Sequence, residues 1–188
     1  MSARVLIPIG KGYEEIEAIS VIDVLRRAGC KVILAAVDEE SQKTLVVESQ
    51  GGVKLVADIK IIEVLSSSID GIVLPGGWEN TQNLIKSKEL GKLLKDLSKR
   101  NRIIGAICAA PLALFKHNIL TTQRFTCYPG IEKEIKNPNY EPNSNVVCEG
   151  NLITSRGPAT ALEFAFFLAS VFAGEQQSEE VQVGMLNV

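Results

Sequence analysis

The segment GAICAAPLALF, residues 105–115, sets one cysteine between a strand-like run and a helix-like stretch. Small residues flank Cys108, as a sharp strand-to-helix turn requires when it lifts one side chain out of a sheet. A thiol at a helix N-terminus has its pKa lowered by unpaired N–H groups and the helix dipole. This pattern predicts a nucleophile with a depressed pKa, although the local sequence alone favours the alternative of a small, buried core residue.

Three carboxylates, Glu14, Glu15 and Glu17, stand at the start of a predicted helix in KGYEEIE. Exposed acids in a first turn complement the helix dipole, and we assign that role to Glu15. Glu17 follows Ile16, which we expect on the core face, so Glu17 is expected at the edge of a crevice. Burial and a neighbouring thiolate would keep its carboxyl group neutral and able to donate a hydrogen bond to sulfur.

The glycine pair in PGGW allows close backbone approach, so the N–H groups of Gly77 and Ala109 are candidates for an oxyanion hole. A plain tight turn is the simpler interpretation of Gly76 and Gly77 and is the more frequent one. The only histidine, His117, lies nine residues after Cys108. On one helix that spacing gives roughly opposite faces and about 13 Å of axial separation. We therefore expect His117 to be structural or solvent-exposed.

Short apolar runs alternate with stretches of helical spacing along the chain. In residues 14–28 the apolar face is expected to contain Ile16, Ile19 and Ile22 or Leu25, with Gly29 as the cap. Continuous apolar strands are buried on both faces, which indicates a mostly parallel sheet between helices. The fold class is therefore a doubly wound α/β fold, whose sites form beyond the carboxyl ends of the strands. The predicted strands are 3–8, 31–37, 71–76, 102–107 and 151–155.

Three segments depart from this alternation. Residues 44–58 predict a hairpin around Gly51 and Gly52. The polar residues 136–145 predict a surface loop, and the tail 174–188, polar and then apolar, is expected to dock on the body or on a partner subunit. With no break in composition, residues 1–188 are read as one domain.

Composition limits the partners and the compartment. The chain has 46% hydrophobic and 22% charged residues and a net charge of -2, with no basic stripe for a nucleic acid or an anionic membrane. Cys30, Cys108, Cys127 and Cys148 form no CxxC pair, so neither a metal site nor a disulfide scaffold is expected. The most apolar run, 159–173, contains Glu163 and is shorter than the roughly 20 residues of a bilayer span. We expect a buried helix there, a cytoplasmic protein, and small molecules or another protein as partners.

Five segments together resemble the ThiJ/PfpI superfamily, and within it the DJ-one branch: KGYEEIEAISVIDVLRRAG, IVLPGGWENTQNL, IGAICAAPLAL, TCYPG and LITSRGPATALEFA. The resemblance covers nearly the whole chain and implies a flavodoxin-like homodimer without a cofactor. It implies that Cys108 is a reactive, easily oxidised thiol and that Glu17 is a protonated acid bonded to it. The resemblance also implies roles for further residues: Glu14, Gly76, Gly77 and Ala109 would line the pocket, and Arg27 would approach from the dimer partner.

The chain departs from the family pattern at three places. Tyr128 stands in TCYPG where many members have histidine, and a phenol is a poor base near neutral pH, so chemistry that depends on histidine is in doubt. QGG at 50–52 lacks the basic residue of many relatives, which leaves anion binding there uncertain. Ala109 replaces the histidine that follows the nucleophile in protease-type relatives, which argues against peptidase activity.

Two functions follow from the resemblance. One is conversion of methylglyoxal or glyoxal to the hydroxy acid, or repair of glycation adducts, with Cys108 as nucleophile and Glu17 as proton shuttle. The other is a redox sensor or chaperone-like protein of the oxidative-stress response, in which Cys108 is oxidised to the sulfinate. A third interpretation, an unrecognised amide or ester as substrate, stays open.

Overall fold

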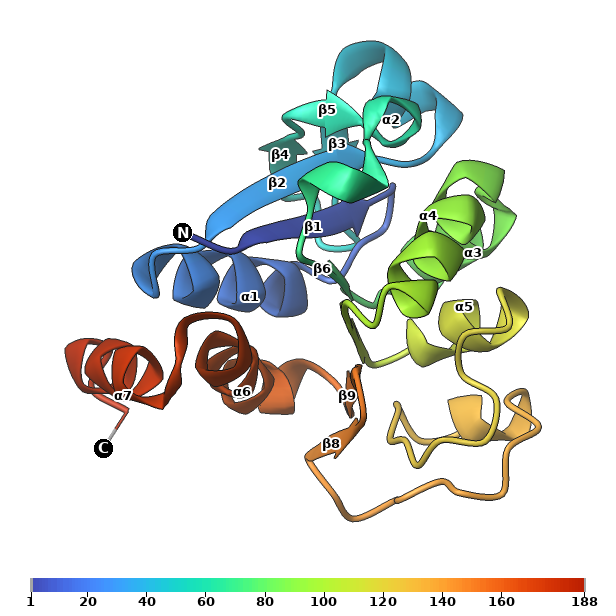
Figure 1. Cartoon of the computed structure of the whole chain (residues 1–188). Helices are drawn as coiled ribbons and strands as arrows, with labels where there is room; N and C mark the ends of the chain where they lie inside the picture. Colours follow the sequence, from blue (N-terminus) through green and yellow to red (C-terminus); the bar gives the residue numbers. More distant parts are fainter. Residues whose placement is uncertain (1, 188) are drawn as a thin grey trace.

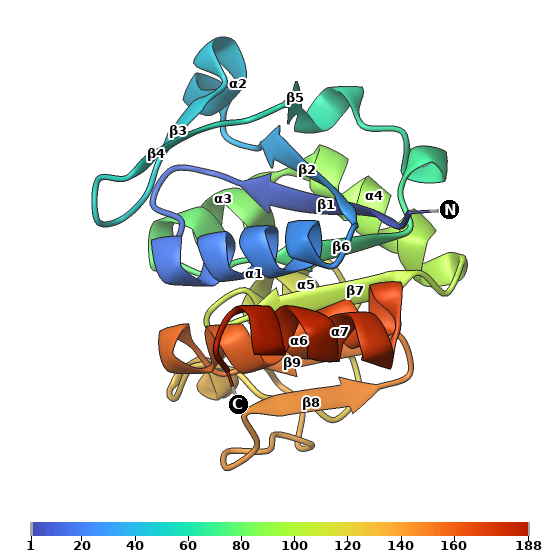
Figure 2. The same cartoon turned by 90° about the vertical axis from the view of Figure 1, so that its left-hand side faces the viewer.

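A computed structural model describes residues 2–187 and contains a seven-stranded sheet in the order β5-β2-β1-β6-β7-β9-β8. All paired neighbours in this sheet are parallel except β8 and β9, so the predicted parallel α/β fold is confirmed. Figure 2 shows the strands following one another from β5 at one edge to β8 at the other. The strands are β1 (Arg4–Ile9), β2 (Lys31–Ala36), β3 (Val46–Glu48), β4 (Lys54–Val56), β5 (Ile59–Lys60), β6 (Gly71–Leu74), β7 (Ile103–Ile107), β8 (Val146–Glu149) and β9 (Leu152–Ser155).

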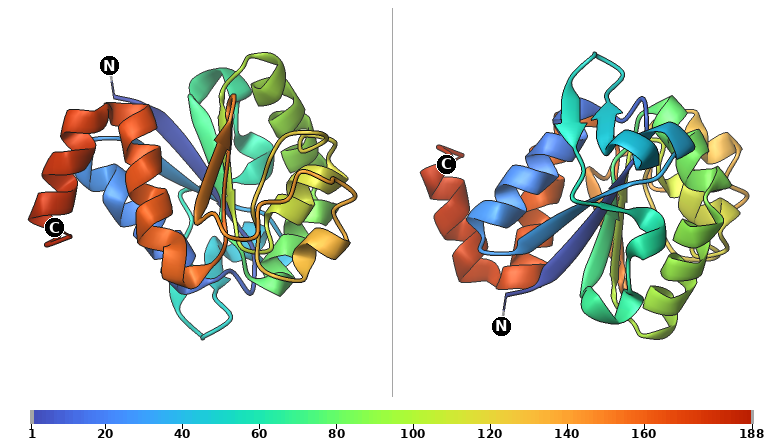
Figure 3. Two further views of the ribbon diagram at one scale, coloured as in Figure 1. Left: turned by 90° about the horizontal axis from the view of Figure 1, so that it is seen from below. Right: turned by 90° about the horizontal axis from the view of Figure 1, so that it is seen from above.

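Helices cover both faces of the sheet (Figure 1; Figure 3). Alternate residues of β1 point into two separate cores, with Val5 and Ile7 in the core below α1 and α6 and Leu6 in the core below α3, α4 and α5. This arrangement explains why the central strands read as continuous apolar runs. The helices are α1 (Glu15–Arg27), α2 (Glu39–Thr44), α3 (Trp78–Lys86), α4 (Lys88–Lys99), α5 (Pro111–Lys116), α6 (Ala161–Ala173) and α7 (Glu175–Gly184).

Helix α1 buries a different face from the one predicted. Ile16 and Ile19 are 54% and 40% exposed, whereas Val21, Leu25 and the acidic Glu17 are buried. The expectation that Ile16 and Ile19 face the core is therefore wrong. The helix turns Ala18, Val21 and Leu25 onto the sheet and α6, and Glu17 lies on that buried side. The predicted cap residue, Gly29, directly follows Ala28 at the end of the helix.

The segments outside the parallel sheet match their predictions in outline. The hairpin is confirmed as the antiparallel pair β3 and β4, and residues 136–145 contain no helix or regular strand. The tail contains α7, which packs on α6 through Val181 and through the Ser178 hydroxyl, a 2.8 Å donor to the Phe166 carbonyl oxygen. Among residues 2–187, no helix has the length and apolar character needed to cross a membrane.

The strand order fixes where a site can form. The chain proceeds from β1 to β2 on one side and returns through β6 to β7 on the other. In open α/β sheets, ligands bind at the carboxyl ends of the strands where the order reverses in this way. The segments after β1, β6 and β7 meet at that point, and they carry Glu17, in the first turn of α1, Gly76 and Cys108 respectively.

Candidate active site

Cys108 occupies the sharp turn that the sequence predicted. Strand β7 ends at Ile107, and Cys108 has a φ of 64°, the left-handed region that residues other than glycine seldom adopt. The turn is closed by a 3.0 Å hydrogen bond from the Ala110 N–H to the Ile107 carbonyl oxygen. The Cys108 N–H donates to the Ser155 carbonyl oxygen of β9 at 3.0 Å. Backbone strain held by such contacts is typical of functional positions, and it presents the Cys108 side chain at the end of the sheet.

Glu17 lies deeper than the crevice edge where it was expected. It is fully buried, and its Oε2 accepts a 2.7 Å hydrogen bond from the Gly76 N–H. Burial raises the pKa of this carboxyl group to about 7, against the opposing effects of the Gly76 N–H and the Cys108 side chain. Its other oxygen, Oε1, is buried and has no hydrogen-bond partner within residues 2–187. An acid in this setting holds a proton near neutral pH.

The thiol and this acid meet over Gly76. A methyl group added at Gly76 would lie 2.6 Å from Glu17 Oε2 and 2.7 Å from the Cys108 Cβ atom, so only a residue without a side chain fits. The two functional groups interact directly, and the pKa of each responds to the other. They form a coupled pair, so loss of the first proton is a property of Cys108 and Glu17 together and not of either group alone.

The pKa of Cys108 is raised, which overturns the expected depression. Burial is the largest cause, followed by the negative charge of ionised Glu17 and the hydrogen bond to it. The N–H groups of Ala109 and Gly77 act in the opposite direction, because they stabilise the charged sulfur. Moreover, α5 begins only at Pro111 and has six residues, so it contributes less than a long helix beginning at the cysteine would.

The predicted oxyanion donors therefore already face the sulfur. Gly77 has a φ of 88°, and a side chain there would collide with the Gly12 carbonyl oxygen. This close approach of the turns after β6 and β1 explains why glycine is needed at position 77. Ala109 is buried directly after the cysteine. Both N–H groups converge on one atom from different strand ends.

Asn80, in α3, is a buried residue of the site that sequence reasoning missed. Its side-chain amide donates to the carbonyl oxygens of Pro75 and Gly76 at 2.9 and 3.1 Å. Its Oδ1 accepts from the Gly10 N–H at 2.7 Å. Asn80 thus ties the end of β1 to the glycine turn after β6. The available signal was a polar side chain soon after PGGW, at a position with helical spacing.

The other two carboxylates near Glu17 have structural contacts. Glu14 is buried and caps α1, because its Oε2 accepts a 2.8 Å hydrogen bond from the Glu17 N–H. Burial raises the pKa of Glu14, and that N–H bond opposes the rise. Glu15 was expected to be exposed but is half-buried, with its carboxylate against Gly51 of the hairpin and Oε2 lacking a partner within residues 2–187. The hairpin covers it, which periodicity within one helix could not indicate.

The remaining predicted residues lie at different distances from the thiol. The Tyr128 N–H donates to the Cys108 carbonyl oxygen at 2.9 Å, and its side chain is 52% exposed. Arg27 is at the far end of α1, in a 2.8 Å ion pair with Asp23, and it lines a hollow with residues of α7. Within one chain it does not reach the site. His117, at the end of α5, is structural, one of the two predicted alternatives, because its Nε2 lies 3.0 Å from the Leu84 carbonyl oxygen of α3.

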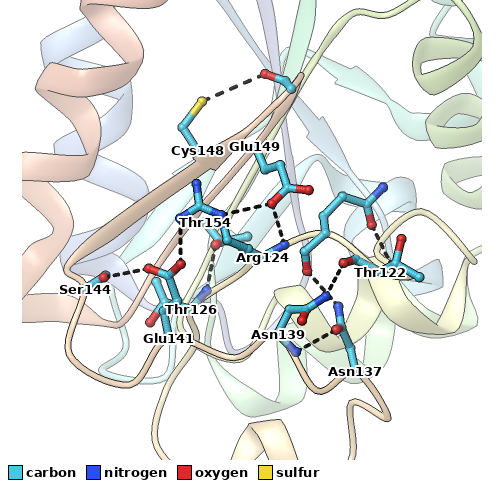
Figure 4. A network of polar contacts seen from close by, with 12 residues as sticks. Thr122, Arg124, Thr126, Asn137, Asn139, Glu141, Ser144, Cys148, Glu149 and Thr154 are labelled. Atoms are coloured by element: carbon cyan, nitrogen blue, oxygen red, sulfur yellow. Dashed lines mark hydrogen bonds and ion pairs between the residues drawn. The ribbon is translucent and has the colours of Figure 1, made fainter.

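A polar network holds the long segment that carries Tyr128. Figure 4 shows Arg124 between Glu141 and Glu149, with ion-pair distances of 2.8 and 3.1 Å. The Thr126 N–H donates to the Thr154 Oγ1 of β9 at 2.9 Å in the same view. These contacts fasten the loop before Tyr128 to β8 and β9. Within residues 2–187 no group of three or more histidine, cysteine or acidic side chains is arranged to hold a metal ion.

Comparisons with known proteins agree with this geometry. The sequence profile of the DJ-1/PfpI family matches residues 3–170. Protein dj-1beta of Drosophila melanogaster is 38% identical over 99% of this chain and 98% of its own, and its crystal structure superposes with a TM-score of 0.93 over the same shares of the two chains. The glutathione-independent glyoxalase DJR-1.2 of Caenorhabditis elegans is 34% identical over 96% of this chain and 93% of its own.

A structure of oxidised Toxoplasma gondii DJ-1 is 32% identical, with a TM-score of 0.91 over 98% of both chains. The family match extends over Glu17, Gly76 and Cys108, and the relatives match this chain almost from end to end. The five segments that suggested the ThiJ/PfpI superfamily thus lie in one continuous match. This chain belongs to the DJ-1/PfpI family.

Proposed function

We propose that the protein is a cofactor-free, cysteine-dependent glyoxalase that converts methylglyoxal or glyoxal to the corresponding hydroxy acid. The observation that carries this proposal is the contact of Cys108 and Glu17 over Gly76. It pairs a nucleophile with an acid whose pKa, about 7, suits proton transfer in both directions near neutral pH. The relative named as a glutathione-independent glyoxalase supports the choice of substrate.

The reactive form of the pair carries one negative charge, on sulfur, with the proton on Glu17. In that form the neutral carboxyl group no longer repels the thiolate and can donate a hydrogen bond to it. The N–H groups of Gly77 and Ala109 stabilise the same charge. Burial opposes the thiolate, so Glu17 and the two N–H groups must supply what a neighbouring histidine supplies in other cysteine enzymes.

The reaction balances without an external oxidant. The Cys108 sulfur bonds to the aldehyde carbon, and the Glu17 proton passes to the carbonyl oxygen, which yields a hemithioacetal. The Glu17 carboxylate then removes the proton from that carbon and returns a proton to the neighbouring ketone carbon, while the hydroxyl proton of the hemithioacetal passes to the ketone oxygen, so the first carbon is oxidised and the second reduced. The product is a thioester of lactate, and water hydrolyses it to lactate and the free thiol. A glycation adduct on a protein or nucleotide would enter through the same first step.

The test is lactate formation from methylglyoxal by highly purified protein. Cys108→Ser removes the nucleophile, and Glu17→Gln removes the proton shuttle while keeping the shape of the side chain. Both variants should lose essentially all activity. Cys148→Ser is the matched control, because Cys148 is an exposed thiol on β8, outside the turns that form the site, and this variant should keep full activity. Full activity in Cys108→Ser or Glu17→Gln would overturn the proposal.

A second candidate function is a redox sensor or chaperone-like protein of the oxidative-stress response in which Cys108 is oxidised to the sulfinate. The unpartnered Oε1 of Glu17 favours it, because Glu17 interacts with Cys108 and a protonated Oε1 would be free to donate a hydrogen bond to an added sulfinate oxygen. The oxidised state named for the Toxoplasma relative agrees with this possibility. The glyoxalase and the sensor both use Cys108 and Glu17. They differ in whether an aldehyde or an oxidant reacts with the Cys108 sulfur.

We further propose that the protein is a cytoplasmic homodimer. The exposed Ile16 and Ile19 on α1 give an apolar face that a second copy would cover. In that arrangement Arg27 would approach the partner's pocket, and the tail with α7 would pack on its own body beside the interface. Sedimentation of the wild type beside Ile16→Glu tests this assembly, and an unchanged mass in the variant would argue against it.

A further inference from the structure

A small pocket is lined by two segments whose backbones are linked to the Cys108 turn, and none of the proposed steps uses it. Its volume is about 200 Å³, and it is lined by the segments 128–129 and 156–160. Both segments join the reactive turn, since the Tyr128 N–H donates to the Cys108 carbonyl oxygen at 2.9 Å and the Cys108 N–H donates to the Ser155 carbonyl oxygen at 3.0 Å. A pocket of this size is smaller than those that hold drug-sized ligands and suits a single substituent.

The walls of this pocket are mostly apolar. The Tyr128 ring lies over Gly157, where an added methyl group would be 3.3 Å from the Tyr128 Cδ2 atom. Pro129 and Pro158 complete the walls and restrict the backbone on both sides. Such walls are preformed and lose little entropy when a substituent enters.

The charged residue in this pocket is Arg156, directly after β9. Its guanidinium group makes no ion pair within residues 2–187, and its Nε has no hydrogen-bond partner there. Arg27 and Arg124, by contrast, are paired with carboxylates. An unpaired guanidinium group is suited to a carboxylate or phosphate.

We propose that the pocket of Tyr128, Pro129, Arg156, Gly157 and Pro158, called here the Arg156 pocket, binds an anionic substituent of the aldehyde that reacts with Cys108. The shared chemistry is a carboxylate or phosphate group, held by the guanidinium while the carbonyl carbon lies at the sulfur. The reaction of the aldehyde at Cys108 rests on the proposed function. Binding of the anionic substituent by Arg156 does not depend on it. Methylglyoxal, with only a methyl substituent, leaves the pocket empty.

The test uses alkylation of Cys108, which does not require turnover. N-iodoacetylglycine carries a carboxylate, and N-iodoacetylglycinamide is its neutral match. The ratio of their alkylation rates at Cys108, measured by peptide mass spectrometry at one pH, cancels any change in the thiolate fraction. A third probe, N-iodoacetyl-O-phosphoethanolamine, tells phosphate from carboxylate as the better substituent.

In Arg156→Gln the anionic-to-neutral ratio should fall about threefold or more, as expected for loss of one partly exposed charge pair. Arg26→Gln is the matched control, because it removes the same charge from an exposed site on α1, and its ratio should equal that of the wild type. An unchanged ratio in Arg156→Gln, or an equal fall in both variants, would overturn the inference.

A second measurement uses only the wild type and decides alone if Arg156→Gln does not fold. Inorganic phosphate should slow the carboxylate probe more than chloride does at equal ionic strength, because phosphate competes for the pocket. Equal effects of the two salts would overturn the inference. Failure of the lactate assay with an intact probe ratio would remove the glyoxalase proposal and leave the Arg156 pocket standing.

Discussion

Tyr128 is joined to Cys108 through its backbone, with its N–H donating to the Cys108 carbonyl oxygen at 2.9 Å. The bond holds the strained turn from one side, while Ser155 of β9 holds it from the other. Because the donor is a backbone group, the identity of the side chain at 128 is not needed for this contact. The family histidine and the tyrosine found here can therefore occupy the same place without disturbing the reactive turn.

Tyr128→Phe should leave Cys108 reactivity nearly unchanged. The variant keeps the backbone bond and the ring over Gly157, and it removes a hydroxyl group that makes no hydrogen bond within residues 2–187. We expect the iodoacetamide alkylation rate at Cys108 to stay within about twofold and lactate formation within about threefold of the wild type. A tenfold loss of lactate formation with normal alkylation would show that the phenol transfers a proton.

Glu17→Gln should change how stability depends on pH. The pKa of Glu17 is about 7 in the folded chain against an ordinary value of 4.5, so between these pH values the folded state binds more protons than the unfolded state. The stability of the wild type therefore falls as pH rises through this window, by up to about 3 kcal/mol. The neutral amide has no such loss. In urea denaturation, the free energy of unfolding of Glu17→Gln relative to that of the wild type should be higher at pH 8 than at pH 5. The same difference between the two proteins at both pH values would contradict the raised pKa.

Gly77→Ala should damage both stability and the site. A methyl group at Gly77 would collide with the Gly12 carbonyl oxygen, whereas one at Gly130 would meet nothing within 4 Å. Both glycines have positive φ, 88° and 102°, so Gly130→Ala measures the backbone strain alone, about 1–2 kcal/mol. Gly77→Ala should lose clearly more in thermal denaturation and should slow Cys108 alkylation. Equal losses in the two variants would mean that the collision is relieved without effect.

Peroxide should oxidise Cys108 before the other three cysteines and stop at the sulfinate. Cys30 and Cys127 are buried, which protects them, and Cys148 is exposed but makes no hydrogen bond to an acidic side chain within residues 2–187. Peptide mass spectrometry after mild treatment measures the order, with Cys148→Ser as the background that removes the exposed competitor. In Glu17→Gln the sulfinate should proceed more readily to the sulfonate. Oxidation of Cys30, Cys127 or Cys148 ahead of Cys108 would remove the basis of the sensor function.

The sequence predicted the strands of the sheet and the turn at Cys108 because these features rest on local chemistry. Runs such as 102–107 are apolar on both faces wherever helices cover both sides of the sheet, so strand and fold class follow together. The small residues around Cys108 predicted the sharp turn that its positive φ produces. Glu17 was singled out by its position at a strand end, together with the family resemblance.

The parts that were mispredicted or missed depend on contacts between distant segments. Ile16 and Ile19 fit a helical stripe, but the packing of α1 on α6 selected the neighbouring face. The direction of the Cys108 pKa shift depends on burial and on the charge at Glu17, neither of which a turn motif reports. The contacts of Asn80 and the pocket of Arg156 form only when the ends of β1, β6 and β9 are brought together by the fold, so the sequence did not indicate them.

The bond from the Gly76 N–H to Glu17 links residues 59 positions apart, so the acid reaches the sulfur only after three turns of the chain have been brought together. A nascent or unfolded chain carries the same cysteine without its acid, its two N–H groups or its strained turn. Such a thiol would titrate as an ordinary one. We therefore expect the labelling rate of Cys108 to differ between the native and the urea-unfolded chain, and the ratio of the two rates measures what the assembled fold contributes to this thiol.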